Sequence, residues 1–253
     1  MSPPDRIDLR AGLALSAPES WFQTLPRPLQ AELARRAQPR FLRAGERLFS
    51  RGDPPDGLYG VSEGMLRISG SHERSGDALL ALVGAPHWFG EIGLFDGDVR
   101  AHDVHAETDA LLVHLPQAVM LAVLEREPGV WLQVGRLLAR KMRSMYVSFE
   151  QMQMLAPRER VARRLVMMAA DYHVDQPTLR RELVVSQEQL ARMLSLSRQT
   201  VNEVLAALEA DGMIRRHRRR IELLDPDRLL QDGPVLLQED RCVDKSVDNL
   251  LMD

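Results

Sequence analysis

The spacing of apolar residues changes several times along the chain and divides it into stretches of different expected structure. From Trp21 to Ala37 the apolar positions follow a helical period, which prolines at positions 26 and 28 break into two short pieces. From Phe41 onwards this period gives way to short runs of Val, Leu and Ile between Gly, Pro and Asp turns. Six runs are predicted strands: Arg47–Ser50, Gly57–Val61, Met65–Ser69, Ala78–Val83, Asp103–Ala106 and Ala110–Leu115. Many short strands with regular turns predict an antiparallel β-roll.

A helical period returns at Pro116 and is sustained from Pro128 to Ala156. The apolar residues of this stretch repeat in a 3-4 heptad rhythm: Trp131, Gly135, Leu138, Met142, Met145, Phe149, Met152 and Ala156. This rhythm predicts the seam of a two-helix coiled coil, and therefore a homodimer. The alternative is an amphipathic helix that lies on its own domain. Because glycine and methionine weaken the seam, other contacts are expected to contribute to dimerisation.

Two short helices joined by a tight turn are predicted in the C-terminal third, after a helix that Pro157 opens. Ser186 is followed three residues later by Gln189, the pattern of a capping box at a helix start. The turn 195–197 ends in a serine that can cap a second helix, Arg198–Ala210. This order of cap, helix, turn and helix indicates a helix-turn-helix.

In such a motif the first residues of the second helix enter the major groove of DNA. Arg, Gln, Asn and Glu side chains match the hydrogen-bonding edges of bases, whereas hydroxyl groups and helix starts bind phosphates. The predicted DNA contacts of the two helices are Ser186, Gln187, Ser197, Arg198, Gln199, Thr200, Asn202 and Glu203.

A basic hairpin is expected directly after these helices, over Ile214–Leu223, with Arg218 and Arg219 at its tip. Such a wing binds phosphates without regard to sequence. The stretch 157–223 contains 13 arginines, no lysine and nine acidic residues, a net charge of +4, although the whole chain has a formal net charge of -3. The last 30 residues carry a net charge of −5. A basic DNA-binding module followed by an acidic tail is therefore expected.

The order of β-roll, long helix and winged helix-turn-helix resembles the Crp–Fnr family of transcription regulators. The resemblance extends over about residues 21–224 and is most specific in two segments, Phe89–Arg100 and Val185–Val201. It implies an α+β fold with a cyclic-nucleotide-binding-like roll, and a homodimer that binds a palindromic operator in double-stranded DNA. RNA polymerase would be a further partner.

The resemblance also implies roles for residues of the first segment. In members that bind cyclic AMP, Gly90 would offer its backbone N–H, Glu91 would accept the ribose 2′-OH next to Ile92, and Arg100 would pair with the phosphate. The family's phosphate-binding serine is replaced here by Ala101.

The family's adenine-binding Thr-Ser pair falls at Met145 and Tyr146, and a thioether donates no hydrogen bond to a purine. We therefore expect no response to cyclic AMP. A larger cyclic dinucleotide remains open, as does a site without ligand in which Glu91 and Arg100 form a structural ion pair. The alternative function is a ligand-independent regulator whose roll serves only dimerisation or protein docking.

We therefore predict five segments of the chain: an N-terminal lead (1–20), the effector-sensing β-roll (21–127), the dimerisation helix (128–156), the DNA-binding domain (157–224) and an acidic tail (225–253).

No catalytic residues and no metal ligands are expected. His102, Asp103 and His105 are ligand types, but residues three apart on a strand point to opposite faces, so the two histidines do not converge. The lone Cys242 cannot form an internal disulfide and is interpreted as a bystander in the tail. With no apolar stretch long enough for a bilayer and no secretion signal, the protein is expected in the cytoplasm, away from membranes.

Overall fold

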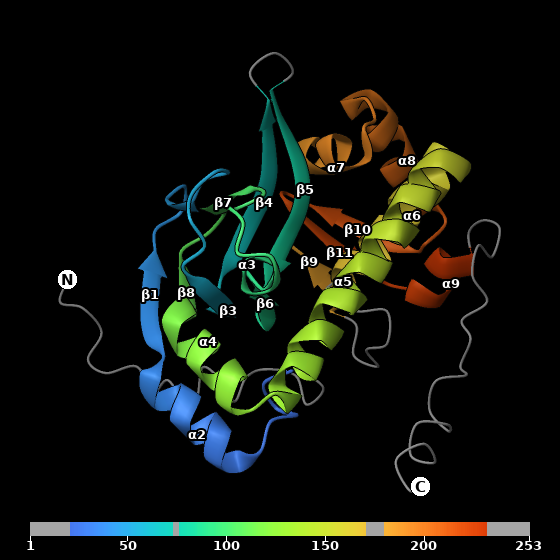
Figure 1. The fold of residues 1–253 in the computed structure, drawn as a ribbon. Helices are drawn as coiled ribbons and strands as arrows, with labels where there is room; N and C mark the ends of the chain where they lie inside the picture. The colour runs from blue at the N-terminus through green and yellow to red at the C-terminus, as the bar shows by residue number, and fades with distance from the viewer. Residues whose placement is uncertain (1–20, 73–75, 171–179, 232–253) are drawn as a thin grey trace, which may run out of the picture.

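The computed structural model describes residues 21–72, 76–170 and 180–231, and Figure 1 shows their arrangement. A β-roll and a smaller helical domain lie at opposite ends of one long helix. The expected N-terminal lead, Cys242 and most of the expected acidic tail fall outside the described residues.

The roll consists of two antiparallel four-stranded sheets. One sheet has the order β1 (Gln38–Leu42), β8 (Ala110–Pro116), β3 (Gly57–Glu63) and β6 (His87–Phe89). The other has the order β2 (Arg47–Phe49), β7 (Asp103–Ala106), β4 (Met65–His72) and β5 (Gly76–Gly84). Side chains from both sheets, including Tyr59, Leu66, Phe89 and Leu112, form the core between them.

All six strands expected from the sequence form, and the α+β fold with an antiparallel roll is confirmed. Strands β1 and β6 were not expected. Strand β1 is an edge strand in which only Leu42 is buried, so it lacks an alternating pattern, and β6 spans three residues.

The helical lead differs from the expectation in detail. Residues 21–25 form turns and a bend, and the first described helix is α2 (Arg27–Arg36). Pro28 lies in its first turn and does not break it, because the N–H that proline lacks has no partner in a first turn anyway. Trp21 and Phe22 instead pack with Trp88 in the apolar core beneath the roll.

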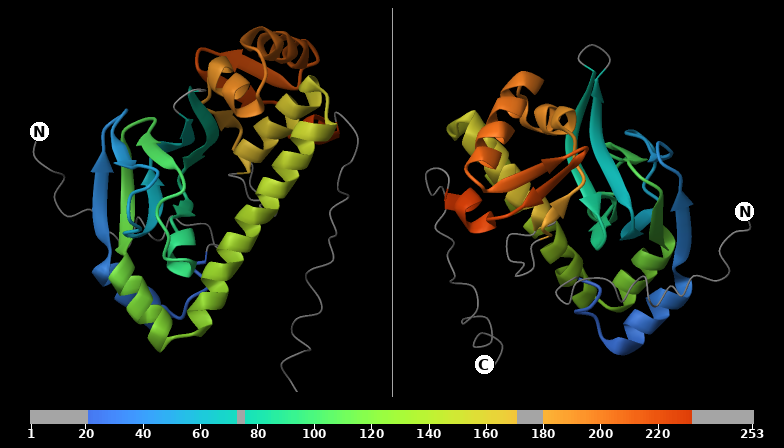
Figure 2. Two further views of the ribbon diagram at one scale, coloured as in Figure 1. Left: turned by 45° about the horizontal axis from the view of Figure 1, so that its top comes forward. Right: turned by 180° about the vertical axis from the view of Figure 1, so that it is seen from behind.

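The long helix α5 (Gly129–Met154) follows α3 (Ile92–Phe95) and α4 (Gln117–Arg126) in the chain. Figure 2 shows α4 and α5 as the two arms of a V, with α5 extending from the roll to the second domain. Val130, Val134 and Leu137 on one face of α5 are buried against the roll. The first half of the helix therefore lies on its own domain, as the alternative interpretation expected.

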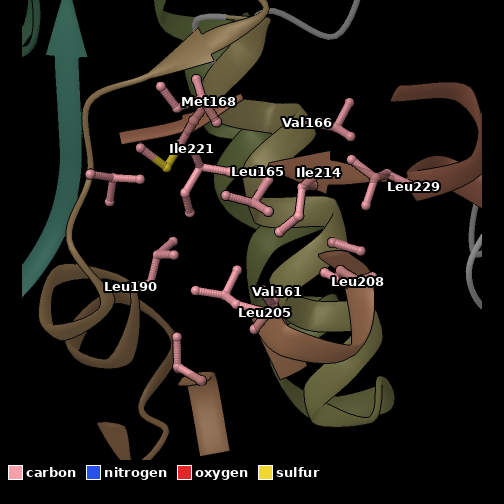
Figure 3. Close-up of a cluster of buried hydrophobic side chains, with 14 of the residues drawn as sticks. Val161, Leu165, Val166, Met168, Leu190, Leu205, Leu208, Ile214, Ile221 and Leu229 are labelled. Atoms are coloured by element: carbon pink, nitrogen blue, oxygen red, sulfur yellow. The ribbon is translucent and has the colours of Figure 1, made fainter. Parts of the chain in front are cut away.

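The second domain comprises α6 (Pro157–Ala169), β9 (Glu182–Leu183), α7 (Gln187–Leu194), α8 (Arg198–Ala210), β10 (Ile214–His217), β11 (Arg220–Leu223) and α9 (Pro226–Gln231). Helix α8 and the hairpin have the limits expected from the sequence. Figure 3 shows the core of the domain, where Val161 and Leu165 of α6 meet Leu205, Ile214 and Ile221.

Candidate nucleic-acid interface and effector site

Local hydrogen bonds hold the two helices of the helix-turn-helix in place. The hydroxyl of Ser186 accepts from the backbone N–H of Gln189 at 3.2 Å, and the Gln189 side chain accepts from the Ser186 N–H at 2.8 Å, which completes the expected capping box. Ser195 ends α7 in the left-handed conformation, with a φ of 52°. Ser197 then caps α8 by accepting from the N–H of Thr200 at 3.0 Å.

The start of α8 presents polar side chains to solvent, while Val201, Leu205 and Leu208 are buried behind them. Arg198, Gln199, Asn202 and Glu203 are all exposed. Gln199 donates to Glu203 at 2.9 Å, and Gln187 of α7 donates to Asn202 at 3.1 Å. The two helices therefore form one continuous polar surface.

The wing completes this surface. Arg218 and Arg219 form the turn between β10 and β11, and a hollow between the wing and the helix-turn-helix is lined by Ser186, Gln187 and Arg198 as well as by these two arginines. Arg218 makes no ion pair among the described residues, so its charge is available to a phosphate.

Most other wing arginines already have acidic partners within the chain. Arg216 bonds Glu209 at 2.7 Å, Arg215 bonds Glu222 at 3.0 Å and Arg220 bonds Glu182 at 3.0 Å.

One carboxylate of the roll contacts both the helix-turn-helix and the wing. Glu107 accepts from Gln189 of α7 at 2.7 Å and lies 3.6 Å from Arg219 at the wing tip. In addition, Leu79 and Leu82 of β5 belong to the same apolar cluster as Leu190 of α7. The DNA-binding domain is thus docked on the β4–β5 hairpin, and α7 lies beside β5 in Figure 1.

In the roll, Gly90 contacts the guanidinium of Arg100, whose side chain is only 6% exposed. Its Nη2 donates to the Asp56 carboxylate and to the Gly57 carbonyl at 2.8 Å, and its Nη1 donates to the Gly90 carbonyl at 3.3 Å. The guanidinium carbon lies 4.4 Å from the ring centroid of Phe49, a cation–π distance. The arginine is therefore held on several sides by the protein itself.

Gly90 has to be glycine in this arrangement. Its φ is +98°, and a Cβ at this position would lie 2.6 Å from the Gly57 carbonyl oxygen and 2.9 Å from Nη1 of Arg100. The backbone at Gly90 therefore lies so close to Arg100 that no side chain fits between them.

Glu91 is paired with a residue from the long helix. Both of its carboxylate oxygens accept from Nζ of Lys141, at 2.9 and 3.1 Å, and the same ammonium donates to the Trp88 carbonyl at 2.6 Å. The Glu91 side chain is 3% exposed and that of Lys141 is 24% exposed. The hypothesis of a Glu91–Arg100 ion pair is therefore wrong, since each residue has a different partner.

The remaining effector candidates are exposed in the single chain. Met145 and Tyr146 are 71% and 68% exposed on α5, Ile92 is 46% exposed, and Ala101 is exposed. Sequence reasoning missed Asp56 and Lys141, whose contacts with Arg100 and Glu91 join residues 44 and 50 positions apart.

A nucleotide fits this cluster only in part. Nε of Arg100 is buried without a hydrogen-bond partner in the described part of the chain, and Gly90 allows close approach of its loop. Against this, three of the four Nη–H donors of Arg100 and both carboxylate oxygens of Glu91 are already used by protein groups. A phosphate and a ribose would have to displace them.

Neither a metal site nor a membrane span is found in the described residues. No group of three His, Cys, Asp or Glu side chains in this part of the chain is arranged to hold a metal ion. None of its helices is both long enough and apolar enough to cross a membrane.

Comparison with known proteins matches both halves of the chain to domain families. Residues 39–127 match the cyclic nucleotide-binding domain family, and residues 159–231 match the Crp-like helix-turn-helix domain family. A CRP-like cAMP-activated global transcriptional regulator of Mycobacterium tuberculosis is 27% identical over 226 residues, which cover 89% of this chain and 97% of the relative.

Two proteins of Thermus thermophilus are also similar. A cyclic AMP receptor protein is 31% identical over 182 residues, which cover 70% of this chain and 80% of the relative. The crystal structure of a CRP-family transcriptional regulator superimposes with a TM-score of 0.59 at 27% identity, covering 76% of this chain and 95% of the other.

Proposed function

The chain belongs to the Crp–Fnr family of transcription regulators, and we propose that it binds a palindromic operator as a homodimer under the control of a nucleotide-like effector in its β-roll. Its DNA-binding and cyclic nucleotide-binding-type domains are those of a ligand-controlled regulator. Residues 21–127 are proposed as the sensing roll, 128–156 as the dimerisation helix and 157–224 as the DNA-binding domain, to which α9 is added because Leu229 packs in its core.

The observation that carries the DNA-binding role is the exposed polar start of α8 beside a basic wing. We assign base contacts to Arg198, Gln199, Asn202 and Glu203, because their side chains are exposed on the face that a recognition helix presents to the major groove. Ser197, Thr200 and the arginines of the wing tip are assigned to phosphates.

The dimerisation role rests on an uncovered apolar stripe in the second half of α5. Met142, Met145 and Phe149 are 49%, 71% and 62% exposed, which is unusual for large apolar side chains of a single chain. A second copy of α5 packed along this stripe would cover it by two-fold symmetry.

The effector is proposed to be a cyclic nucleotide or cyclic dinucleotide. The relative from M. tuberculosis is named for activation by cAMP, but Ala101 and Met145 of this chain lack the hydroxyl groups expected for that ligand. A ligand-independent regulator stays as the second candidate, because both Nη2 donors of Arg100 and one Nη1 donor are already engaged by the protein. A cytoplasmic location and contact with RNA polymerase follow only from the role proposed.

The decisive experiment selects DNA from a pool of random duplexes with the full-length protein, followed by footprinting. We expect an inverted repeat whose half-sites lie about one helical turn, roughly 34 Å, apart. Arg198→Ala should relax the preference at one base pair of each half-site, whereas Arg35→Ala, which removes an exposed arginine from α2, should retain it. Equal enrichment of unrelated sequences by the wild-type protein would refute the proposed function.

Dimerisation is tested separately by analytical ultracentrifugation. Phe149→Glu places a charge in the exposed stripe and should produce monomers, while Gln153→Glu, on the same helix but outside the heptad seam, should leave the dimer intact. A stable wild-type monomer would contradict the assignment of the stripe.

A further inference from the structure

The Arg100 cluster contains a carboxylate at the position where an effector phosphate is expected to bind. Of the five N–H donors of the Arg100 guanidinium, two on Nη2 are taken by Asp56 and the Gly57 carbonyl, and one on Nη1 is taken by the Gly90 carbonyl. The Nε–H is buried. A phosphate that is to be gripped by two parallel N–H groups therefore has to compete with Asp56.

Asp56 is fixed in this position by neighbours on two strands. Tyr59 of β3 donates its hydroxyl to the carboxylate. The ring of His114 on β8 stacks on Tyr59 with centroids 4.4 Å apart, and its Nε2 lies 3.0 Å from the Asp56 carbonyl oxygen. The backbone N–H of Gln117 also donates to this oxygen, at 2.8 Å. These contacts of its backbone and side chain therefore hold the Asp56 carboxylate in its position next to Arg100.

The same neighbours keep Asp56 charged. Burial acts to raise its pKa, but the hydrogen bonds from Tyr59 and Arg100 and the charge of Arg100 outweigh burial and hold the pKa below its usual value. An anionic effector would therefore meet a carboxylate that already neutralises its arginine.

Glu91, the other charged residue implied for effector binding, is also paired with a protein group. Lys141 covers both oxygens of Glu91, which the family resemblance assigns to a ribose hydroxyl. Asp56, Arg100, Glu91 and Lys141 form two ion pairs with no net charge. A ligand with one phosphate charge replaces one anion on Arg100 by another and leaves the displaced Asp56 close to it, so it gains little electrostatic energy.

We propose that Asp56 is a specificity-determining residue of the effector site: its carboxylate acts as a built-in competitor for Arg100 that any phosphate-bearing ligand has to displace. This inference rests on the proposed effector control. It explains how a chain can keep both Glu91 and Arg100 and still bind a cyclic mononucleotide weakly. It also defines the effector as a ligand with enough further contacts, or enough negative charge, to release Asp56.

Calorimetry with cyclic AMP as the probe, on dimer shown by its absorbance to be free of nucleotide, tests the proposal. Asp56→Asn removes the charge and keeps the shape, and it should bind cyclic AMP about tenfold or more tightly than wild type, a change of about 1.4 kcal/mol. Asp98→Asn makes the same substitution in the loop that precedes Arg100, where the carboxylate accepts from the N–H of the next residue, and should change nothing. The double variant Asp56→Asn/Arg100→Ala should lose the gain.

A second variant guards against misfolding of Asp56→Asn. Tyr59→Phe removes the hydroxyl that fixes the carboxylate but keeps the ring, and it should give a smaller gain in affinity. If Asp56→Asn binds cyclic AMP no better than wild type while its unfolding temperature shows an intact fold, the proposal is overturned. A gain that survives removal of Arg100 overturns it too. Neither outcome involves DNA, so failure here is distinguishable from failure of the operator selection.

Discussion

The DNA-facing and effector-facing regions of this chain place their charges in opposite ways. At the start of α8 the charged and amide side chains are exposed, and the hydrogen bonds around them join residues three to fifteen positions apart. In the roll, Glu91 and Arg100 are buried and bonded to residues 50 and 44 positions away. One region offers its polar groups to a partner, whereas the other has already satisfied them internally.

This difference predicts how each region responds to mutation. An exposed base-reading side chain contributes to binding and little to folding, so its removal should leave the protein stable. A buried ion pair contributes to folding first, because removal of one partner leaves the other charged and poorly solvated. Mutations of the exposed side chains in the DNA-binding domain should therefore change DNA binding without changing stability. Mutations of the buried ion pairs in the roll should change both ligand binding and stability.

The largest effect is expected from Lys141→Met. This change leaves the Glu91 carboxylate, 3% exposed, without its counter-ion and should lower the free energy of unfolding by about 3–5 kcal/mol. Chemical denaturation measures it. Arg143→Met, on the exposed face of the same helix, is the control, and Lys141→Met/Glu91→Gln should recover part of the loss. If Lys141→Met is as stable as the control, the pair does not support the fold.

Arg198→Ala should act on DNA binding alone. The loss of a bidentate contact to a base is expected to cost about 1–3 kcal/mol, chiefly at one base pair of each half-site, with no change in unfolding temperature. Binding titrations against operators with single substitutions locate that base pair. A uniform loss over all operators would show that Arg198 contacts phosphate and not a base.

The sequence predicted the DNA-binding domain closely because its signals are local. Ser186 and Gln189 are three residues apart and bond each other, and the limits of α8 follow from Ser197 at one end and from Gly212 after the other. Six of the eight strands of the roll were also predicted, since each of these six has its own apolar run. Patterns of this kind predict the structure of short segments.

The partners in the roll could not be predicted in this way. Asp56 meets Arg100 only after two sheets have folded against each other, and no pattern within a few residues of either marks the contact. Lys141 gave a weak signal that was missed: lysine occurs only at 141 and 245 in this chain, and position 141 continues the buried face of Val130, Val134 and Leu137. An ammonium with three donors fits the three oxygen atoms that it contacts there.

The two arginines at the wing tip should differ in a way that links the two regions. Arg218 makes no ion pair among the described residues, while Arg219 lies 3.6 Å from Glu107 of the roll. Arg218→Ala should weaken binding to all DNA sequences alike and reduce the slope of log affinity against log salt by about 1. Arg219→Ala should have a smaller effect on non-specific binding, because release from Glu107 offsets part of the phosphate contact. Equal slopes for both variants would show that Glu107 does not hold the wing in solution.

The smallest expected effect is that of acidic pH on the free energy of unfolding. It can be compared for one carboxylate from each region, Glu209 and Asp56. Hydrogen bonds from Arg216 hold the pKa of Glu209 below its usual 4.5, and those from Tyr59 and Arg100, against the opposing effect of burial, hold the pKa of Asp56 below its usual 3.8. A carboxyl group whose pKa is lowered in the folded protein stabilises the fold at pH values above its usual pKa. This stabilisation is lost as the pH falls through the lowered pKa.

Glu209→Gln and Asp56→Asn should therefore be less stable than wild type at pH 7. This stability gap should narrow below pH 4.5 for Glu209→Gln and below pH 3.8 for Asp56→Asn. Both members of the Arg216–Glu209 pair are partly exposed, whereas Asp56 is half-exposed but its partner Arg100 is buried. Added salt should therefore shrink both stability gaps, and it should shrink that of Glu209→Gln more. Urea unfolding at several pH values and two salt concentrations measures both, and a gap that widens in acid would contradict the assigned charge of that carboxylate.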